Sequence, residues 1–299
     1  MPGLSEILKA SMGATDTTLS GTLTPEQAHN FIDVIKDNSK ILQDINLVKM
    51  GRLTKELDAW DVAKGILVRV PSGERPTEAQ RQKLGVIGTK LEAKNVQLFA
   101  RILQDALEEN KHNPKFESET FNAFSKAFGN DLALLGFTGS SDTYANSFET
   151  LHKGWVQIAK DSSEAAKLTY AANDKIKDIL LSLVKAIPED IKGEAVIFIN
   201  PADLLSYNVE LSSLNSPAHL IEAGASKIGG IKLYETSLIK KGTFLATPLK
   251  NLILGTVLDI RRNRWYDPEE RALKYVFDIA VDYEIAVKKW VVLMEKKVG

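Results

Sequence analysis

The sequence of 299 residues contains no cysteine, and this absence excludes several kinds of site. Disulfide bonds, thiolate nucleophiles and zinc sites with cysteine ligands are all impossible. No apolar run reaches about 18 residues, the minimum for a membrane helix. The N-terminal stretch MPGLSEILKASMGATDTTLSGTL lacks the apolar segment of a signal peptide. It is rich in Ser, Thr and Gly, so we expect a mobile arm on a soluble intracellular protein.

Recognisable catalytic motifs are also missing. The sequence has neither a Walker loop nor a GxSxG elbow. The stretch GASKIGG at 224–230 lacks the GKS/T ending of a phosphate loop and is better interpreted as a turn. None of the four histidines has a partner at i+4 that would suggest a metal site, so each is expected to be structural or on the surface: His29, His112, His152 and His219. We therefore predict no enzyme activity, no cofactor and no metal.

The charge balance narrows the possible partners. Lys and Arg number 38 and Asp and Glu number 39, which argues against a dedicated DNA-binding protein. Hydrophobic residues make up 44% of the chain, enough for a sizeable core.

Several segments carry a helical pattern. Thr24-Pro25-Glu26-Gln27 has the form of a capping box, with Pro at the first helical position. After Pro114, a phenylalanine stripe with spacings of 3 and 4 predicts a long helix, with Ser118 as its cap and Gly136 at its C-terminal end. Two more helices are expected at Val96–Asn110 and Asp174–Ile187, the first from the spacing of Leu98, Ile102, Ala106 and Leu107.

Residues 51–94 differ in character from their surroundings. They are charged and rich in turn residues, with short strand candidates at Ile66–Val70 and Val86–Leu91 and a small helix at Thr77–Lys83. The segment has too few apolar residues for a core of its own. We predict an extended two-stranded excursion that is supported from outside.

Strands are expected in the second half of the chain, at Ala195–Pro201, Ile231–Glu235, Phe244–Thr247 and Leu252–Leu258. KYVFDIAVDYEIAV then alternates with period two over eleven residues from Tyr275 to Ile285, and the Asp267-Pro268 turn signal precedes it. The pattern predicts a long β-hairpin with an arginine cluster at its tip. Asp278, Asp282 and Glu284 share one face of the strand. They could be paired carboxylates of an active site, but we prefer to interpret them as the solvated face of the strand.

The arginine cluster occurs in the stretch NLILGTVLDIRRNRWYDP at 251–268. Arginine forks suit phosphate, so a nucleic-acid grip is one interpretation. Carboxylates interleave with the arginines, however, and Arg, Trp and Tyr are frequent anchors of protein interfaces. We favour a subunit contact made by Arg261, Arg262, Arg264, Trp265, Asp267, Glu269 and Glu270.

The order of these elements resembles that of the major capsid proteins of tailed bacteriophages with the Hong Kong 97-type fold, an α+β fold. The resemblance rests on residues 98–139, on GEAVIFINPADLL and on GGIKLYETSLIKKGTFLATPLKNLILGTVLDIRRNRWYDP. The last stretch is most like the P-two-like group, because Thr247, Lys250, Asn251 and Leu252 lead into paired arginines.

The resemblance implies a division of the chain. Residues 1–45 would form an N-terminal arm and short helix, and 46–95 the extended loop. Residues 96–199 and 247–299 would build the peripheral domain, and 200–246 the axial domain. The tip of the hairpin would meet neighbouring subunits near a three-fold or quasi-three-fold axis, where charge reversal at Arg262 should impair assembly.

The resemblance also implies a function and partners. The chain would assemble with itself, as pentamers and hexamers, into an icosahedral shell around double-stranded DNA. Scaffolding, portal and decoration proteins are further expected partners, and a membrane is not. The protein would be located in the virion after assembly in the host cytoplasm. The alternative is an encapsulin-like nanocompartment shell, which shares the fold.

Overall fold

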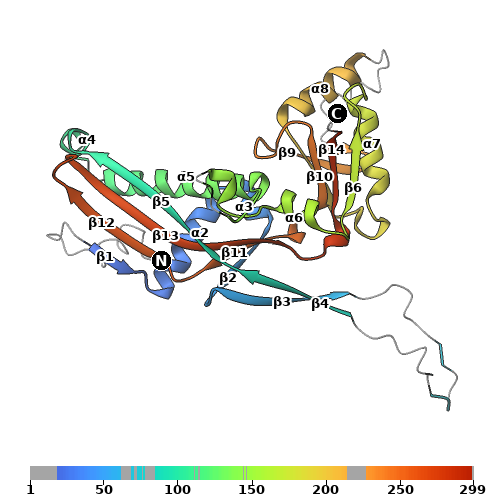
Figure 1. Cartoon of the computed structure of the whole chain (residues 1–299), viewed down its shortest axis with the longest axis horizontal. Coiled ribbons are helices and arrows are strands. Elements are labelled where there is room, and N and C mark those ends of the chain that lie inside the picture. Colours follow the sequence, from blue (N-terminus) through green and yellow to red (C-terminus); the bar gives the residue numbers. More distant parts are fainter. Residues whose placement is uncertain are drawn as a thin grey trace.

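A computed structural model describes residues 19–61, 69–70, 73–75, 77, 85–110, 112–113, 115–143, 145, 147–213 and 227–297. The molecule has two lobes, each built on a six-stranded sheet, and a two-stranded hairpin that projects from the first lobe (Figure 1). The first lobe is elongated, with the long strands running along it, and the second lobe stands at one of its ends (Figure 1).

The sheet of the first lobe is centred on one long strand, β13, at Ala272–Ile285. Its strand order is β1-β12-β13-β11-β2, and β5 pairs with the other edge of β13. The remaining strands are β1 at Leu19–Thr22, β2 at Asn46–Met50, β5 at Lys94–Leu103, β11 at Leu252–Val257 and β12 at Arg261–Asp267. All the pairings are antiparallel except that of β11 with β2.

Helices cover one face of this sheet, the inner face, which carries Tyr275 and Phe277 of β13. The helix α2, Pro25–Asp37, starts with the predicted capping box, in which the Thr24 hydroxyl accepts the Gln27 N–H at 3.3 Å. Phe31 of α2 stacks on Phe277 of β13 with ring centroids 5.6 Å apart. A short helix α3, Lys40–Asp44, then leads into β2.

The predicted long helix is α5, Phe116–Thr138, but both of its expected end residues lie inside it. Lys115 occupies the N-cap in place of Ser118, and Gly139 occupies the C-cap in place of Gly136. Gly136 has another use, because a Cβ there would lie 2.3 Å from the ring of Trp155. The absence of a side chain lets the helix α6, Trp155–Asp161, pack closely against α5.

The helix predicted at Val96–Asn110 is wrong over most of its length. Residues 94–103 form the strand β5, and only Gln104–Glu109 is helical, as α4. Leu98 and Ile102 both pack against the main core, and their spacing of four residues fits a strand as well as a helix. Pairing with β13 over ten residues decides in favour of the strand.

The second lobe has a sheet of order β6-β14-β10-β7-β9-β8. Its strands are β6 at Ala166–Tyr170, β7 at Ala195–Ile199, β8 at Lys227–Ile228, β9 at Ile231–Glu235, β10 at Thr243–Pro248 and β14 at Val292–Lys296. The helices α7, Ile176–Ala186, and α8, Pro201–Ser213, pack on it (Figure 1). Every residue of β7 is buried, as its continuous apolar run predicts.

The predicted division of the chain stays a prediction. Strands of the second sheet come from 166–296, so segments 96–199 and 247–299 each supply strands to both sheets.

The projecting hairpin consists of β3, Thr54–Asp61, and β4, Gly85–Glu92. The strand predicted at Val86–Leu91 is therefore confirmed. The strand predicted at Ile66–Val70 and the helix predicted at Thr77–Lys83 lie largely outside the described residues.

The foot of the hairpin is anchored on the outer face of the first sheet. Leu91 is fully buried in a small cluster with Met50, Ile253, Val257 and Ala280. Gly255 of β11 makes room for it, because a Cβ there would lie 3.1 Å from the ends of the Leu91 and Met50 side chains. The hairpin is thus supported from outside, as its composition predicts, and the support at its foot comes from its own chain.

Candidate assembly interface

Strand alternation divides the arginine cluster between the two faces of the first sheet. Arg262 and Arg264 lie opposite Phe277 and Tyr275, whose rings belong to the core on the helix side. Arg261 lies opposite Asp278, on the outer face. The cluster is therefore not one patch, and the predicted position at the hairpin tip is wrong for these arginines, which lie along β12.

The two faces give the arginines different environments. The Arg264 guanidinium lies 5.7 Å from the centroid of the Tyr275 ring, within the range of a cation–π contact. The Arg261 side chain is 65% exposed, and it approaches the carboxylate of Asp259 at 3.9 Å. Trp265 lies opposite Lys274, on the same face as Arg261, and is half-buried. Arg261 is thus the arginine of the cluster that is best placed to meet another molecule.

The acidic residues do lie at the tip, but two of them are paired within the chain. The Lys274 ammonium donates to Asp267 and to Glu270, each at 2.7 Å. Arg101 of β5 reaches Glu270 at 3.3 Å. The hydrogen bonds from Lys274 hold the pKa of both carboxyls below their usual values and raise the pKa of Lys274.

The turn of the hairpin is held by contacts within itself and with Gln104, the first residue of α4. The Glu269 N–H donates to Asp267 at 3.0 Å, and Arg271 adopts a left-handed φ of 47°. Gln104 accepts from the Tyr266 hydroxyl at 2.7 Å and from Arg271 Nε at 3.2 Å. The tip is therefore a fixed feature of the subunit, with Glu269 exposed on it.

A cavity of about 320 Å³ opens on the outer face beside the foot of the hairpin. Its charged lining residues are Arg52, Asp259, Arg261 and Asp278. Leu53, a further lining residue, is 56% exposed, and Phe99 on β5 is 69% exposed. Mixed charges beside exposed apolar side chains are typical of a surface that another protein covers.

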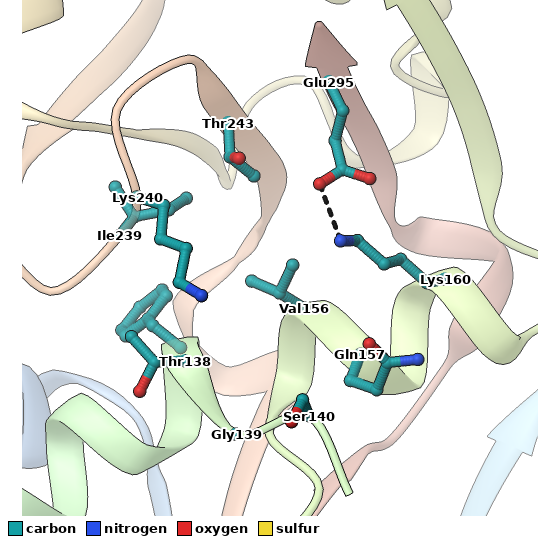
Figure 2. Close-up of a pocket in the computed structure, with 11 residues that line it drawn as sticks. Thr138, Gly139, Ser140, Val156, Gln157, Lys160, Ile239, Lys240, Thr243 and Glu295 are labelled. Atoms are coloured by element: carbon teal, nitrogen blue, oxygen red, sulfur yellow. Dashed lines mark ion pairs between the residues drawn. The ribbon is translucent and has the colours of Figure 1, made fainter. Parts of the chain in front are cut away.

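A smaller cavity of about 70 Å³ lies where the two lobes meet, between the C-terminal end of α5, α6 and the loop before β10 (Figure 2). The Lys160 ammonium and Glu295 form an ion pair of 2.8 Å across its rim (Figure 2). A second pair, Lys240 with Glu149 at 2.9 Å, also joins the two lobes. These contacts connect the lobes, and the cavity is too small for a cofactor.

The carboxylates of β13 do not form a catalytic pair. Asp278 and Asp282 lie on the outer face at separate places, and Glu284 approaches Lys288 at 3.7 Å. The prediction of a solvated face is wrong for Asp282, which is buried beneath the foot of the hairpin, beside His152. Of the other histidines, His219 lies outside the described residues.

Within the described part of the chain, no group of His, Cys, Asp and Glu could hold a metal ion. The helices in this part are also too short or too polar to cross a membrane.

The sequence did not predict the cavity at the foot of the hairpin or the burial of Asp282. The one residue in the sequence that could have indicated this packing is Gly255, whose missing side chain leaves room for Leu91.

No family model matches the chain. By sequence it is similar to the protein YqbE of Bacillus subtilis (strain 168), whose name describes a prophage capsid protein, with 25% identity over 150 residues. The match covers 49% of this chain and 48% of that protein, so the chain spans about half the length of this curated relative.

By structure, the chain is similar to a chain of the satellite phage P4 procapsid that includes the size determination (Sid) protein. The TM-score is 0.71 at 15% identity, over 90% of this chain and 99% of that chain. It is also similar to a capsid chain of the empty GTA particle, with a TM-score of 0.60 at 11% identity over 99% of both chains. A chain of the virus-like particle from Pyrococcus furiosus gives 0.54 at 11% identity, over 90% of this chain and 98% of that chain.

The chain therefore has the α+β Hong Kong 97-type capsid fold that its sequence predicts. The resemblance to phage capsid proteins is confirmed, and the finer likeness to the P-two-like group stays a prediction.

Proposed function

We propose that this protein is the major capsid subunit of a tailed bacteriophage or prophage, which assembles with itself into an icosahedral shell around double-stranded DNA. The observation that carries the proposal is the match of 90% of this chain to 99% of a procapsid chain. The similarity covers nearly the whole of a chain from an assembled procapsid, which supports the role of a shell subunit. The proposed role is accordingly structural, within the virion.

The shape of the subunit supports self-assembly. The β3–β4 hairpin projects from the body and touches the rest of its own chain at its foot, so its length is available to other subunits (Figure 1). Contacts of this kind, repeated between identical subunits, close into rings and shells. The net charge of −1 limits repulsion between the many copies.

An encapsulin-like nanocompartment would share this fold. The curated relative is named for a prophage capsid, which favours the phage head. Pentamers and hexamers, and scaffolding, portal and decoration partners, belong to the same proposal, as does assembly in the host cytoplasm.

Electron microscopy of the full-length protein tests the proposal. The chain would be expressed alone and together with the products of its neighbouring genes, and the particles would be purified and treated with nuclease. We expect closed shells, and protected double-stranded DNA when packaging proteins are present. A persistent monomer under every condition would refute the proposal, and shells that hold a protein cargo would favour the nanocompartment.

Charge reversal tests the interface. The sequence points to Arg262, but its side chain is on the helix face, so reversal there would disturb the fold as well as assembly. Arg261→Glu is the cleaner variant, because its side chain is 65% exposed. We expect a subunit that melts like the wild type but forms few shells. Lys167→Glu on β6, also exposed, is the control. Normal shells from Arg261→Glu would exclude this residue from the interface.

A further inference from the structure

His152 and Asp282 form a buried pair that no part of the proposed function uses. The two residues are 5% and 7% exposed, and His152 Nε2 lies 3.3 Å from one Asp282 oxygen. The other Asp282 oxygen accepts the backbone N–H of Glu92 at 2.6 Å. Glu92 is the last residue of β4, so the pair contacts the extended hairpin where it joins the body.

The contacts of the imidazole define where its proton lies. His152 Nδ1 is 3.0 Å from the Lys153 carbonyl oxygen. A carbonyl can only accept, so Nδ1 carries a proton and Nε2 of the neutral ring is left as an acceptor. Nε2 is buried without a hydrogen-bond partner in the structure, and the Asp282 oxygen 3.3 Å away could supply one only by carrying a proton. If Asp282 were ionised, two lone pairs would face each other. The contact is favourable only when one proton lies between Nε2 and the carboxyl oxygen.

We propose that His152 and Asp282 share one proton and that this proton latches the foot of the extended hairpin to the first sheet. When the proton is lost, a buried carboxylate faces the imidazole lone pair, with the backbone N–H groups of Glu92 and, more weakly, Tyr283 to compensate it. A buried charge of that kind is costly, and water relieves the cost when it enters. Water can enter if the end of β4 lifts away from β13. This inference does not depend on the proposed function.

Charged side chains on several neighbouring elements act on the pair. Glu92 of β4 and Glu284 of β13 raise the pKa of Asp282, and each is paired, with Lys90 and with Lys288 respectively. Lys94 of β5 and Asp142 act on His152 with opposite signs and form an ion pair with each other. Lys153, beside His152, is paired with Asp161 at 2.8 Å.

Burial is the largest influence on the pKa of both groups. It raises the pKa of Asp282 to about 7 and lowers the pKa of His152, so the shared proton resides mainly on the carboxyl.

The sign of the pH dependence follows from counting protons. When the foot is open, the pair has the ordinary pKa values of about 3.9 and 6.5 for Asp and His, so near pH 5 it binds one proton, as many as the closed pair. Between about pH 6.5 and 8 the open imidazole loses its proton first, and the open foot binds fewer protons than the latch. Rising pH in this window therefore favours opening.

Hydrogen exchange of the full chain, followed by mass spectrometry, tests the latch. The readout is the protection of peptides that span 88–94, corrected at each pH for the intrinsic exchange rate. Because the closed foot retains its proton to a higher pH than the open foot, opening should increase from pH 6 to pH 8. Unchanged protection across this range in the wild type would overturn the proposal.

Two variants and a control make the test specific. Asp282→Asn places a permanent N–H donor opposite Nε2 and retains an acceptor for Glu92, so opening should no longer increase from pH 6 to pH 8. It should instead decrease, because only the open imidazole then gains a proton at the lower pH. In His152→Gln, the amide N–H of the new side chain donates to the carboxylate and should lower the pKa of Asp282 below the range of pH 6 to 8. This variant provides a second test if Asp282→Asn folds poorly. Asp278→Asn, on the same strand, should behave like the wild type. If Asp278→Asn abolishes the increase in opening from pH 6 to pH 8, as Asp282→Asn should, the latch is refuted.

Discussion

Replacing Leu91 by alanine should release the extended hairpin from the body while leaving the two lobes folded. Leu91 is the residue of β4 that is fully buried in the cluster at the foot. Replacement of a buried leucine by alanine costs about 2–5 kcal/mol, through lost transfer energy and the cavity left behind. This cluster is small and close to the surface, so we expect the lower part of that range, about 2–3 kcal/mol.

That cost translates into a measurable opening of the foot. At about 1.4 kcal/mol for each factor of ten, opening should increase roughly 30- to 140-fold. Hydrogen exchange of peptides from β4 measures this increase directly, and peptides from β7, in the second lobe, should keep their protection. If assembly needs the hairpin to leave the body at a fixed angle, the yield of shells should also fall.

Leu53→Ala is the matched control for this experiment. Leu53 lies at the same foot but is 56% exposed, so its loss should cost less than about 0.5 kcal/mol. The reasoning would be wrong if Leu91→Ala changed the exchange of β4 by less than about threefold. It would also be wrong if β4 and β7 lost protection equally, because the hairpin would then not open as a local unit.

Two further predictions concern the body of the subunit. Gly136→Ala should lower the free energy of unfolding by about 1–3 kcal/mol, because a Cβ 2.3 Å from the fully buried Trp155 ring outweighs the gain of about 1 kcal/mol in helix propensity. Chemical denaturation measures this change, and a more stable variant would show that Trp155 can move aside. Thr24→Ala removes the hydroxyl that caps α2 and should cost about 1 kcal/mol, with Thr24→Ser restoring most of it. Equal stability of the two Thr24 variants would contradict the capping role.

Local sequence patterns correctly predicted those helices and strands whose pattern fits only one type of secondary structure. The capping box at Thr24, the apolar run of β7 and the long strand predicted from the alternation in β13 all correspond to the observed structure. These patterns depend on backbone hydrogen bonding and on which face of an element is buried. Both depend on residues that are close together in the sequence, so they can be predicted without knowledge of the fold.

Other features needed the tertiary structure. The spacing of Leu98 and Ile102 fits a helix or a strand, and pairing with β13 decided the matter. The arginines at 261, 262 and 264 are neighbours in sequence, but the pleat of β12 places them on opposite faces of the sheet.

In the candidate site, too, some features could be predicted from the sequence and others could not. The residues alone indicated a projecting segment and a lack of recognisable catalytic motifs, and the resemblance to a known family implied the α+β capsid fold. Only the tertiary structure decided that the foot of the hairpin covers Asp282 and brings His152 beside it. The physical reason is that burial of a polar strand position depends on what packs over it from distant parts of the chain, and a period-two pattern carries no information about that cover.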